Sequence, residues 1–241
     1  MGAAQFFVEG VRAAGETVPI VGGDAHKIVH VLRKRSGDAV EVVDSGAQRF
    51  QATLLIEDGA VRARLVERTS SVGHESKQIT VAQGLPKGQK MDFVVEKLTE
   101  LGVHAIVPLL SERSVASGAS ENKLERWRRL AKTAAAQCGR DDIPQIASPE
   151  SFDALLESFA QYDRVLFPWE LAEEVPLNTV LPKLVENASS ILLVIGPEGG
   201  FSHAEADRAR EHGAHVIGFG RRILRTETAA LVAVALLNYA V

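Results

Sequence analysis

The sequence has few of the features that mark secreted and membrane proteins. Its single cysteine, Cys138, excludes a disulfide within the chain, as is typical of proteins from a reducing compartment. The apolar patch Phe6-Phe7-Val8 is interrupted by Glu9 and is too short for the core of a signal peptide. No other apolar run approaches the roughly 20 residues that span a bilayer. We therefore expect a cytoplasmic protein with no membrane partner.

Positive charge is not in excess either, although nucleic-acid binders commonly carry a surplus of Lys and Arg. The 27 basic and 31 acidic residues give a net charge of -4. The acidity is concentrated after residue 145, where 7 basic residues stand against 13 acidic ones, and residues 73–145 hold 11 basic and 9 acidic residues. Basic clusters such as Arg33-Lys34-Arg35 remain upstream. The charge distribution permits an RNA-binding surface without indicating one.

Several familiar catalytic motifs are absent. The chain has no Gly-x-Ser-x-Gly turn and no Lys-Ser or Lys-Thr after a glycine-rich loop. Its only Gly-x-Gly, Gly218-Phe219-Gly220, has Ile223 in place of a third glycine, which argues against an ordinary Rossmann-type methyltransferase. His26 and His30 have the spacing of a metal pair but no third ligand nearby, and Cys138 is interpreted as a small buried hydrophobe. We expect no metal.

The first seventy residues have the pattern of a small β-barrel with one helix. Short segments of alternating polarity are separated by turn residues, and Asp58-Gly59 is typical of a hairpin. A helix is expected over 24–35, capped by Asp24, with Ile28, Val31 and Leu32 at helical spacing. The polar stretch 69–76 is the expected linker. The expected strands are 5–9, 17–21, 39–44, 49–56 and 61–68.

From Gln78 onward strands alternate with helices, which is typical of a mostly parallel sheet covered on both faces. Ser202 and Glu205 have the spacing of a capping box, and Ser148 with Pro149 is typical of a helix start. The length of 241 residues and the 46% apolar content fit two unequal folded domains. The expected strands are 79–83, 105–110, 164–167, 191–195 and 215–219, and the expected helices are 89–101, 121–137, one from 148, 177–186, 202–213 and 228–239.

The segment from Ile191 to Ser202 joins an apolar strand to a helix through Gly196-Pro197-Glu198-Gly199-Gly200. Such a turn places unpaired backbone N–H groups at the carboxyl edge of a parallel sheet, where α/β domains bind ligands. A tight turn that binds nothing is an equally good interpretation of this segment alone. The segment therefore marks a candidate site without identifying its ligand.

A second loop, Gly218 to Ala229, leads from a strand end through three arginines into an apolar helix. Arg221, Arg222 and Arg225 at one sheet edge suit contact with phosphate or with a developing negative charge. Pairing with Glu198, Glu227 or solvent is the alternative for any single arginine. Their position beside the glycine loop favours a shared site.

The chain resembles the RsmE family of 16S ribosomal RNA uridine N3-methyltransferases, which belongs to the SPOUT class. The resemblance covers nearly the whole length and is most specific in its last two blocks. Seven ordered blocks carry it: His30-Val-Leu-Arg33 with Gly37-Asp38; Gln83-Gly-Leu-Pro-Lys-Gly88 with Lys90-Met91; Lys97-Leu-Thr-Glu-Leu-Gly102; Ser111-Glu-Arg-Ser114; Gln137-Cys-Gly-Arg140 with Pro144; Ile195-Gly-Pro-Glu-Gly-Gly-Phe-Ser202; and Arg222-Ile-Leu-Arg-Thr-Glu-Thr-Ala229.

The resemblance implies an α/β fold of two domains. Residues 1–72 would form a PUA-like β-barrel for RNA recognition, and residues 73–241 a SPOUT domain with helices on both faces of a mostly parallel sheet and a C-terminal trefoil knot. It further implies a homodimer that transfers a methyl group from S-adenosylmethionine to uracil N3 of 16S rRNA in the small ribosomal subunit. There are two alternatives. The chain could be another SPOUT enzyme, acting on tRNA or on a ribose 2′-oxygen, or a ribosome-assembly factor that binds RNA without catalysis.

The resemblance also implies the site. The cofactor would lie among three strand-end loops, and basic residues outside them would contact RNA. Uracil N3 becomes nucleophilic only as its proton leaves, so a cation near O2 or O4 would stabilise the developing anion, for which Arg225 is the candidate. Glu198, or else Glu227, would orient the base or take the proton. The expected cofactor-binding residues are Leu166, Phe167, Pro168, Ile195, Gly196, Gly199, Gly200, Phe219, Gly220, Ile223, Leu224 and Thr226, and the expected RNA-binding residues are Arg33, Lys87, Lys90, Arg113, Arg140 and Arg222.

Two residues depart from the family pattern. Gln5 stands where an arginine often precedes the first strand, which would remove a phosphate contact. Ala136 stands where a glutamate is common, so a role for that carboxylate is not expected here.

Overall fold

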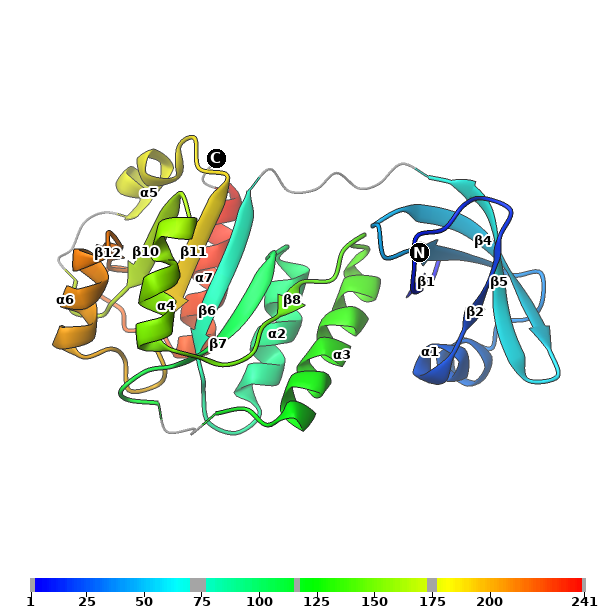
Figure 1. Ribbon diagram of the computed structural model, residues 1–241, viewed down its shortest axis with the longest axis horizontal. Coiled ribbons are helices and arrows are strands. Elements are labelled where there is room, and N and C mark those ends of the chain that lie inside the picture. Colours follow the sequence, from blue (N-terminus) through cyan, green and yellow to red (C-terminus); the bar gives the residue numbers. More distant parts are fainter. Residues whose placement is uncertain (1–2, 70–76, 115–117, 173–176, 240–241) are drawn as a thin grey trace. The chain divides into compact units, whose positions relative to one another are not determined.

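The structure, a computed structural model, describes residues 3–69, 77–114, 118–172 and 177–239. The chain forms two compact units, unit 1 with residues 1–74 and 135–142, and unit 2 with residues 75–134 and 143–241 (Figure 1). The linker expected over 69–76 lies, apart from Thr69, outside the described residues. A domain boundary at residue 72 stays a prediction, and the segment 135–142 packs with unit 1.

Unit 1 is built on a five-stranded sheet with the order β1-β3-β4-β5-β2. β1 pairs with β3 in parallel and the other pairs are antiparallel. Asp58 and Gly59 join β4 to β5 with φ angles of 47° and 80°, as a two-residue hairpin turn requires, which confirms the predicted hairpin. The strands are β1 Gln5–Phe7, β2 Thr17–Ile20, β3 Ala39–Val43, β4 Arg49–Glu57 and β5 Ala60–Arg68.

The helix expected over 24–35 is shorter and less regular than predicted. α1 (Gly22–His26) runs into a π-helical turn over Lys27–Val31, and Asp24 lies in the first turn without capping it. The Leu32 amide donates to the Lys27 carbonyl five residues back, which shifts the helical phase. Ile28 is buried, whereas Val31 is 64% and Leu32 is 37% exposed, so the three apolar residues do not share one buried face.

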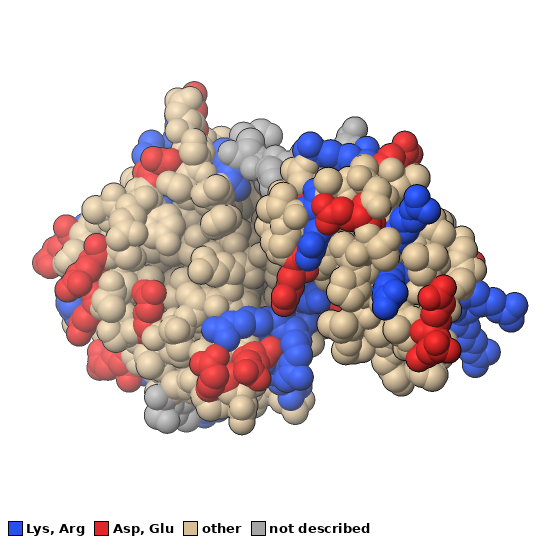
Figure 2. Space-filling view, turned by 45° about the vertical axis from the view of Figure 1, so that its right-hand side comes forward, with Lys and Arg blue, Asp and Glu red and all other residues tan. Residues whose placement is uncertain are grey.

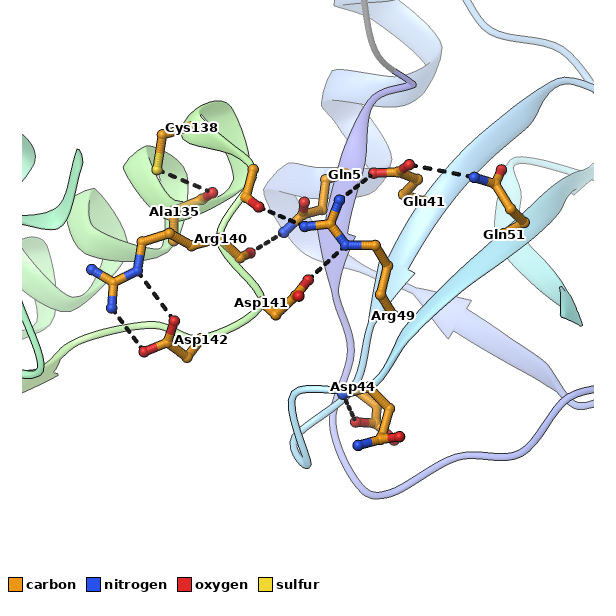
Figure 3. Close-up of polar contacts among 12 residues, drawn as sticks. Gln5, Glu41, Asp44, Arg49, Gln51, Ala135, Cys138, Arg140, Asp141 and Asp142 are labelled. Carbon is orange, nitrogen blue, oxygen red and sulfur yellow. Dashed lines mark hydrogen bonds and ion pairs between the residues drawn. The ribbon is translucent and has the colours of Figure 1, made fainter. Parts of the chain in front are cut away.

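Arg49 on β4 binds three groups of unit 1 at once (Figure 3). Its guanidinium donates to Asp141 at 2.6 Å, to Glu41 at 3.0 Å and to the Gly139 carbonyl at 2.5 Å. Gln5 donates to the Arg140 carbonyl beside it. The Asp141 side chain is 2% exposed, so this is a largely buried ion pair. Gln5 is itself buried, and therefore its position contacts the 139–142 turn rather than an external phosphate.

Replacing Arg49 with methionine is expected to lower the free energy of unfolding by roughly 3–5 kcal/mol, because the buried Asp141 carboxylate would lose its ion pair with Arg49. Urea unfolding measures the loss. The matched control is Arg128→Met, since Arg128 pairs with Glu121 on an exposed helix surface and should contribute less than about 1 kcal/mol. Equal losses in the two variants would contradict the buried-pair interpretation.

Unit 2 is a parallel sheet with the order β12-β10-β11-β6-β7-β8, and β9 also pairs with β7. Each of its strand pairs is parallel. From β6 the chain adds β7 and β8 outward in one direction. It then forms β10, returns to place β11 between β10 and β6, and adds β12 outside β10. The strands are β6 Gln78–Gly84, β7 Ala105–Leu110, β8 Gln145–Ile146, β9 Glu150–Ser151, β10 Arg164–Pro168, β11 Ser190–Ile195 and β12 His215–Ile217.

Helices cover both faces of this sheet (Figure 1). One face packs on α2, α3, α5 and α7, and the other packs on α4 and α6. Alternate strand residues divide between the two cores: Leu193 joins the first, whereas Leu192 and Val194 join the second. The helices are α2 Lys90–Glu100, α3 Glu121–Cys138, α4 Phe152–Ser158, α5 Leu177–Val185, α6 His203–Glu211 and α7 Thr226–Tyr239, with a 3-10 turn over Phe159–Gln161.

Two predictions about helix ends had different outcomes. The capping box at Ser202 and Glu205 is confirmed, because both reciprocal hydrogen bonds are present. The helix start at Ser148 is wrong, since β9 intervenes and Ser151 caps α4 instead. Cys138, expected to be buried, is exposed. Of the helices in the described ranges, none combines the length and apolarity needed to cross a bilayer.

Candidate active site

A cavity of about 670 Å³ lies at the carboxyl ends of β10, β11 and β12. Pro168 to Glu170, Ile195 to Phe201 and Gly218 to Thr226 form most of its wall. The volume falls in the usual range for small-molecule sites, and the carboxyl edge of a parallel sheet is where such sites form. The two loops singled out in the sequence thus share one cavity.

Glycines allow the chain to approach itself closely around this cavity. A Cβ on Gly84, at the end of β6, would lie 2.6 Å from the Gly196 carbonyl carbon and would overlap the nitrogen of Pro197. A Cβ on Gly200 would overlap the carboxylate of Glu170, and Gly200 has a φ of 65°. Glycine is therefore required at position 84, where backbone is in the way, and is favoured at position 200 by its positive φ.

A buried hydrogen-bond chain fixes the two loops to the sheet. The Gln83 amide donates to the Thr226 hydroxyl at 2.7 Å, and this hydroxyl donates to the Gly196 carbonyl at 2.5 Å. Gln83 is fully buried and Thr226 is 6% exposed. Thr226 therefore holds the start of α7 against the glycine loop.

Trp169 connects the three strand ends. Its backbone N–H donates to the Ile217 carbonyl at 2.9 Å, and its indole N–H donates to the Phe201 carbonyl at 3.2 Å. The ring is buried, and the Arg210 guanidinium lies 5.5 Å from its centre. Trp169 thus sets the position of the next residue, Glu170, which lines the cavity and is exposed.

Glu198 is held by hydrogen bonds at the cavity wall. Partial burial acts against its charge, but the Lys87 amide at 3.0 Å and the Lys90 ammonium at 3.1 Å keep the pKa of Glu198 below its ordinary value. Lys90 also lies 3.7 Å from Glu227. The Glu198 carboxylate is therefore ionised at neutral pH and is a weak base.

The arginines of the second loop are exposed at the cavity mouth. Arg222 and Arg225 make no ion pair with any described residue, so the alternative of pairing with Glu198 or Glu227 does not hold for these two. Ile223, between them, is 82% exposed. In the described part of the chain, the amides of Ile223 and Leu224 donate to no protein oxygen and remain available to a ligand.

Most of the expected cofactor-binding residues come together in the cavity wall. Leu166 and Phe167 do not: both are at most 1% exposed, and Phe167 packs on Phe201 with ring centres 4.3 Å apart. Their side chains belong to the two cores. The wall contains the other ten: Pro168, Ile195, Gly196, Gly199, Gly200, Phe219, Gly220, Ile223, Leu224 and Thr226.

The expected RNA-binding residues occupy different environments. Lys90 and Arg222 line the cavity, and Arg113 donates to the Gly199 carbonyl at 3.0 Å. In unit 1, Arg140 pairs with Asp142 at 2.7 Å and Arg33 is exposed. Lys87 is exposed, with its amide on Glu198. The structure thus gives Lys90, Arg113 and Arg140 partners within the protein.

Sequence reasoning missed Trp169, Glu170 and the close approach at Gly84. Trp169 and Glu170 directly follow β10, and their position after a buried parallel strand was a signal that could have found them. Gly84 belonged to a recognised block, but its contact with the Gly196–Pro197 peptide joins residues more than a hundred positions apart. Within the described ranges, no group of three or more His, Cys, Asp or Glu residues is placed to hold a metal ion.

Comparison with known proteins defines the class and then the family. A model of the RNA methyltransferase domain matches residues 74–238, so this part of the chain is an RNA methyltransferase domain. The chain is 32% identical to the ribosomal RNA small subunit methyltransferase E of Bacillus subtilis, over 98% of this chain and 96% of that protein. The corresponding Mycobacterium bovis protein is 32% identical over 97% and 90%. The chain belongs to the family of ribosomal RNA small subunit methyltransferase E, and the resemblance drawn from its motifs is confirmed.

A solved structure supports the fold assignment. The ribosomal RNA small subunit methyltransferase E of Neisseria gonorrhoeae, bound to S-adenosyl methionine, is similar with a TM-score of 0.86 and 27% identity. The similarity covers 98% of this chain and 97% of that one.

Proposed function

We infer that this protein transfers a methyl group from S-adenosylmethionine to 16S rRNA of the small ribosomal subunit, at uracil N3. The observation that carries the proposal is the glycine-lined cavity at three parallel strand ends, in a chain of this family. The 16S rRNA, as part of an assembled small subunit, is the proposed partner, and the cytoplasm is the proposed location.

The cavity suits S-adenosylmethionine in size and in chemistry. Gly196, Gly199 and Gly200 place backbone in the cavity wall, and the amides of Ile223 and Leu224 offer hydrogen-bond donors. The apolar side chains of Ile195, Phe219 and Leu224 would pack against the adenosine. When bound, the cofactor supplies a methyl group on a cationic sulfur. Our proposal is that the ten wall residues hold it, without side-chain contacts from Leu166 or Phe167.

Arg225 is the proposed catalytic cation. It precedes buried Thr226, which is fixed to Gly196, and it lies at the cavity mouth with no ion pair among the described residues. An unpaired guanidinium can donate to O2 or O4 of uracil as the N3 proton leaves. The hydrogen bond of Thr226 thus fixes the backbone next to Arg225, while the Arg225 side chain itself stays free to contact the substrate.

Glu198 is proposed to orient the uracil ring, and the N3 proton is proposed to pass to solvent water. Since the pKa of Glu198 is lowered, its interaction with Lys90 is fully present above the ordinary carboxyl pKa and is lost only as pH falls through the lowered value. Turnover should therefore show no Glu198 titration between about pH 6 and pH 9. Glu198→Gln should lower turnover by the same factor across that range. A limb of the pH–rate profile that vanishes in Glu198→Gln would identify this carboxylate as the base instead.

The remaining features of the proposal concern the assembly. A PUA-like barrel in unit 1 would bind RNA, a C-terminal knot would shape the cofactor loops, and two chains would form a homodimer. The exposed Leu236 and Tyr239 on the apolar helix α7 support an interface between copies. Arg33, Lys87 and Arg222 are exposed and suit phosphate contact, whereas the protein partners of Lys90, Arg113 and Arg140 favour a structural role for these three.

Incubation of assembled small subunits with radiolabelled S-adenosylmethionine tests the activity. Label in 16S rRNA at uracil N3, located by mass mapping of nucleosides, is the expected result, and unlabelled rRNA would refute the proposal. Label in tRNA or on a ribose 2′-oxygen would indicate a different RNA methyltransferase. Calorimetry separates the assembly-factor alternative, because a non-catalytic binder need not bind the cofactor at all.

A further inference from the structure

We propose that the outer face of β5 in unit 1 is a binding surface for the phosphate backbone of single-stranded RNA, with Arg62 and Arg64 as its contacts. This surface, called here the β5 face, also includes Thr17 and Pro19 of β2 and Thr53 and Leu55 of β4. The inference rests on the proposed function for its choice of polyanion. It adds two residues that the motifs did not point to.

Strand alternation creates this face. Val61, Ala63 and Leu65 are at most 4% exposed and enter the core of unit 1, whereas Arg62 and Arg64 point to the opposite face and are exposed. Residues two apart on one strand are separated by about 6.8 Å, so the two guanidiniums form a short row. β5 lies between β4 and β2, which excludes the protection of a sheet edge as the reason for these charges.

No acidic side chain lies opposite the two arginines. Arg64 stands between Thr53 and Thr17, and Arg62 stands between Leu55 and Pro19. Neither arginine forms an ion pair with any residue in the described ranges. Two like charges at neighbouring positions on one face repel each other, and a polyanion laid along the row would relieve that repulsion.

Two acidic side chains of unit 1, Asp44 and Glu41, are engaged in contacts away from the β5 face. Asp44 accepts hydrogen bonds from the amides of Arg12, Gly46 and Gln48. Glu41 binds Arg49. Residues 1–72 hold 9 basic and 9 acidic residues, so their count is balanced. Asp44 and Glu41 make contacts within the unit, whereas Arg62 and Arg64 form no ion pair with any described residue.

The surroundings of the row indicate which part of RNA it would contact. Its neighbours are threonine, proline, leucine and the 56% exposed Val66, with no aromatic ring among these residues to stack a base. Contact with phosphates is therefore expected, and it would position the RNA without reading its sequence. Basic side chains reach the surface of unit 1 in Figure 2, with acidic side chains between some of them.

The salt dependence of RNA binding tests this surface in the full-length protein. The probe is a fluorescein-labelled single-stranded RNA, titrated with wild type and with Arg62→Gln/Arg64→Gln. Loss of two phosphate contacts should reduce the slope of log K against log salt by about 1.4. Between 50 and 200 mM salt, the variant should therefore lose roughly sevenfold less affinity than wild type. An unchanged slope would overturn the proposal.

Two further variants separate charge from folding. Arg62→Lys/Arg64→Lys keeps both charges and should retain the wild-type slope; a slope as low as that of the glutamine variant would overturn the phosphate role. Arg128→Gln removes an exposed arginine that pairs with Glu121 and should leave the slope unchanged. S-adenosylmethionine affinity should be equal in all variants. If wild type methylates rRNA but has the same slope as Arg62→Gln/Arg64→Gln, only this inference fails. If the two slopes differ but wild type does not methylate rRNA, only the proposed function fails.

Discussion

Arg225→Ala is expected to lower turnover on small subunits by about 10²- to 10³-fold while leaving S-adenosylmethionine affinity nearly unchanged. Removing one preorganised donor from a developing anion costs this much in other enzymes. The side chain is exposed and unpaired among the described residues, so its loss removes no internal contact. Single-turnover rates with saturating RNA and cofactor measure the effect on the chemical step, and calorimetry measures cofactor affinity.

Arg222→Ala is the matched control, because Arg222 is an exposed arginine of the same loop and lines the same cavity. It should raise KM for the ribosomal subunit more than it lowers kcat. Arg225→Lys should recover part of the lost turnover, since charge returns without the planar fork of donors. Full turnover in Arg225→Ala would exclude Arg225 from the mechanism.

Gly84→Ala is expected to weaken cofactor binding by at least about tenfold and to lower the free energy of unfolding by about 1–3 kcal/mol. The new Cβ would overlap the Gly196–Pro197 peptide, which cannot rotate away as a flexible side chain could. Displacing that peptide would also disturb the Thr226 hydrogen bond to Gly196. Calorimetry with S-adenosylmethionine and urea unfolding measure the two effects.

Gly23→Ala tests whether any glycine substitution has this effect. Gly23 lies in α1 with open space around its Cα and no positive φ, so alanine should be neutral or slightly stabilising there. Wild-type cofactor affinity in Gly84→Ala would show that the loop tolerates the shift, and the close approach would then be unimportant for binding.

The spacing of apolar residues predicted most regular elements of the fold, because in these elements the apolar residues of the sequence are the ones that the structure buries. The strands of unit 2 were found since Ile191 to Ile195 are buried on both faces, and the α6 start was found since its capping box is local. The local sequence pattern failed in two places. The π-helical turn after α1 changed which side chains face the core near Val31, and β9 lies where the sequence predicted the start of a helix.

The site was predictable in its loops and not in its contacts. Glycines and arginines after strands marked the cavity wall, because the carboxyl ends of parallel strands share an edge. The Gln83–Thr226–Gly196 chain, the Trp169 bridge and the Gly84 approach each join residues remote in sequence, so no local pattern encodes them. The side chains of Leu166 and Phe167 pack in the two cores and do not line the cavity, although their strand ends at it.

The contribution of residues 139–142 to unit 1 affects how the protein can be divided. A fragment that stops at residue 72 would leave the Arg49 guanidinium without Asp141 and the Gly139 carbonyl, and the Gln5 amide without the Arg140 carbonyl. We therefore expect that residues 1–72 cannot be expressed, exchanged or deleted as an independent domain. Grafting it onto another enzyme would require the later turn as well.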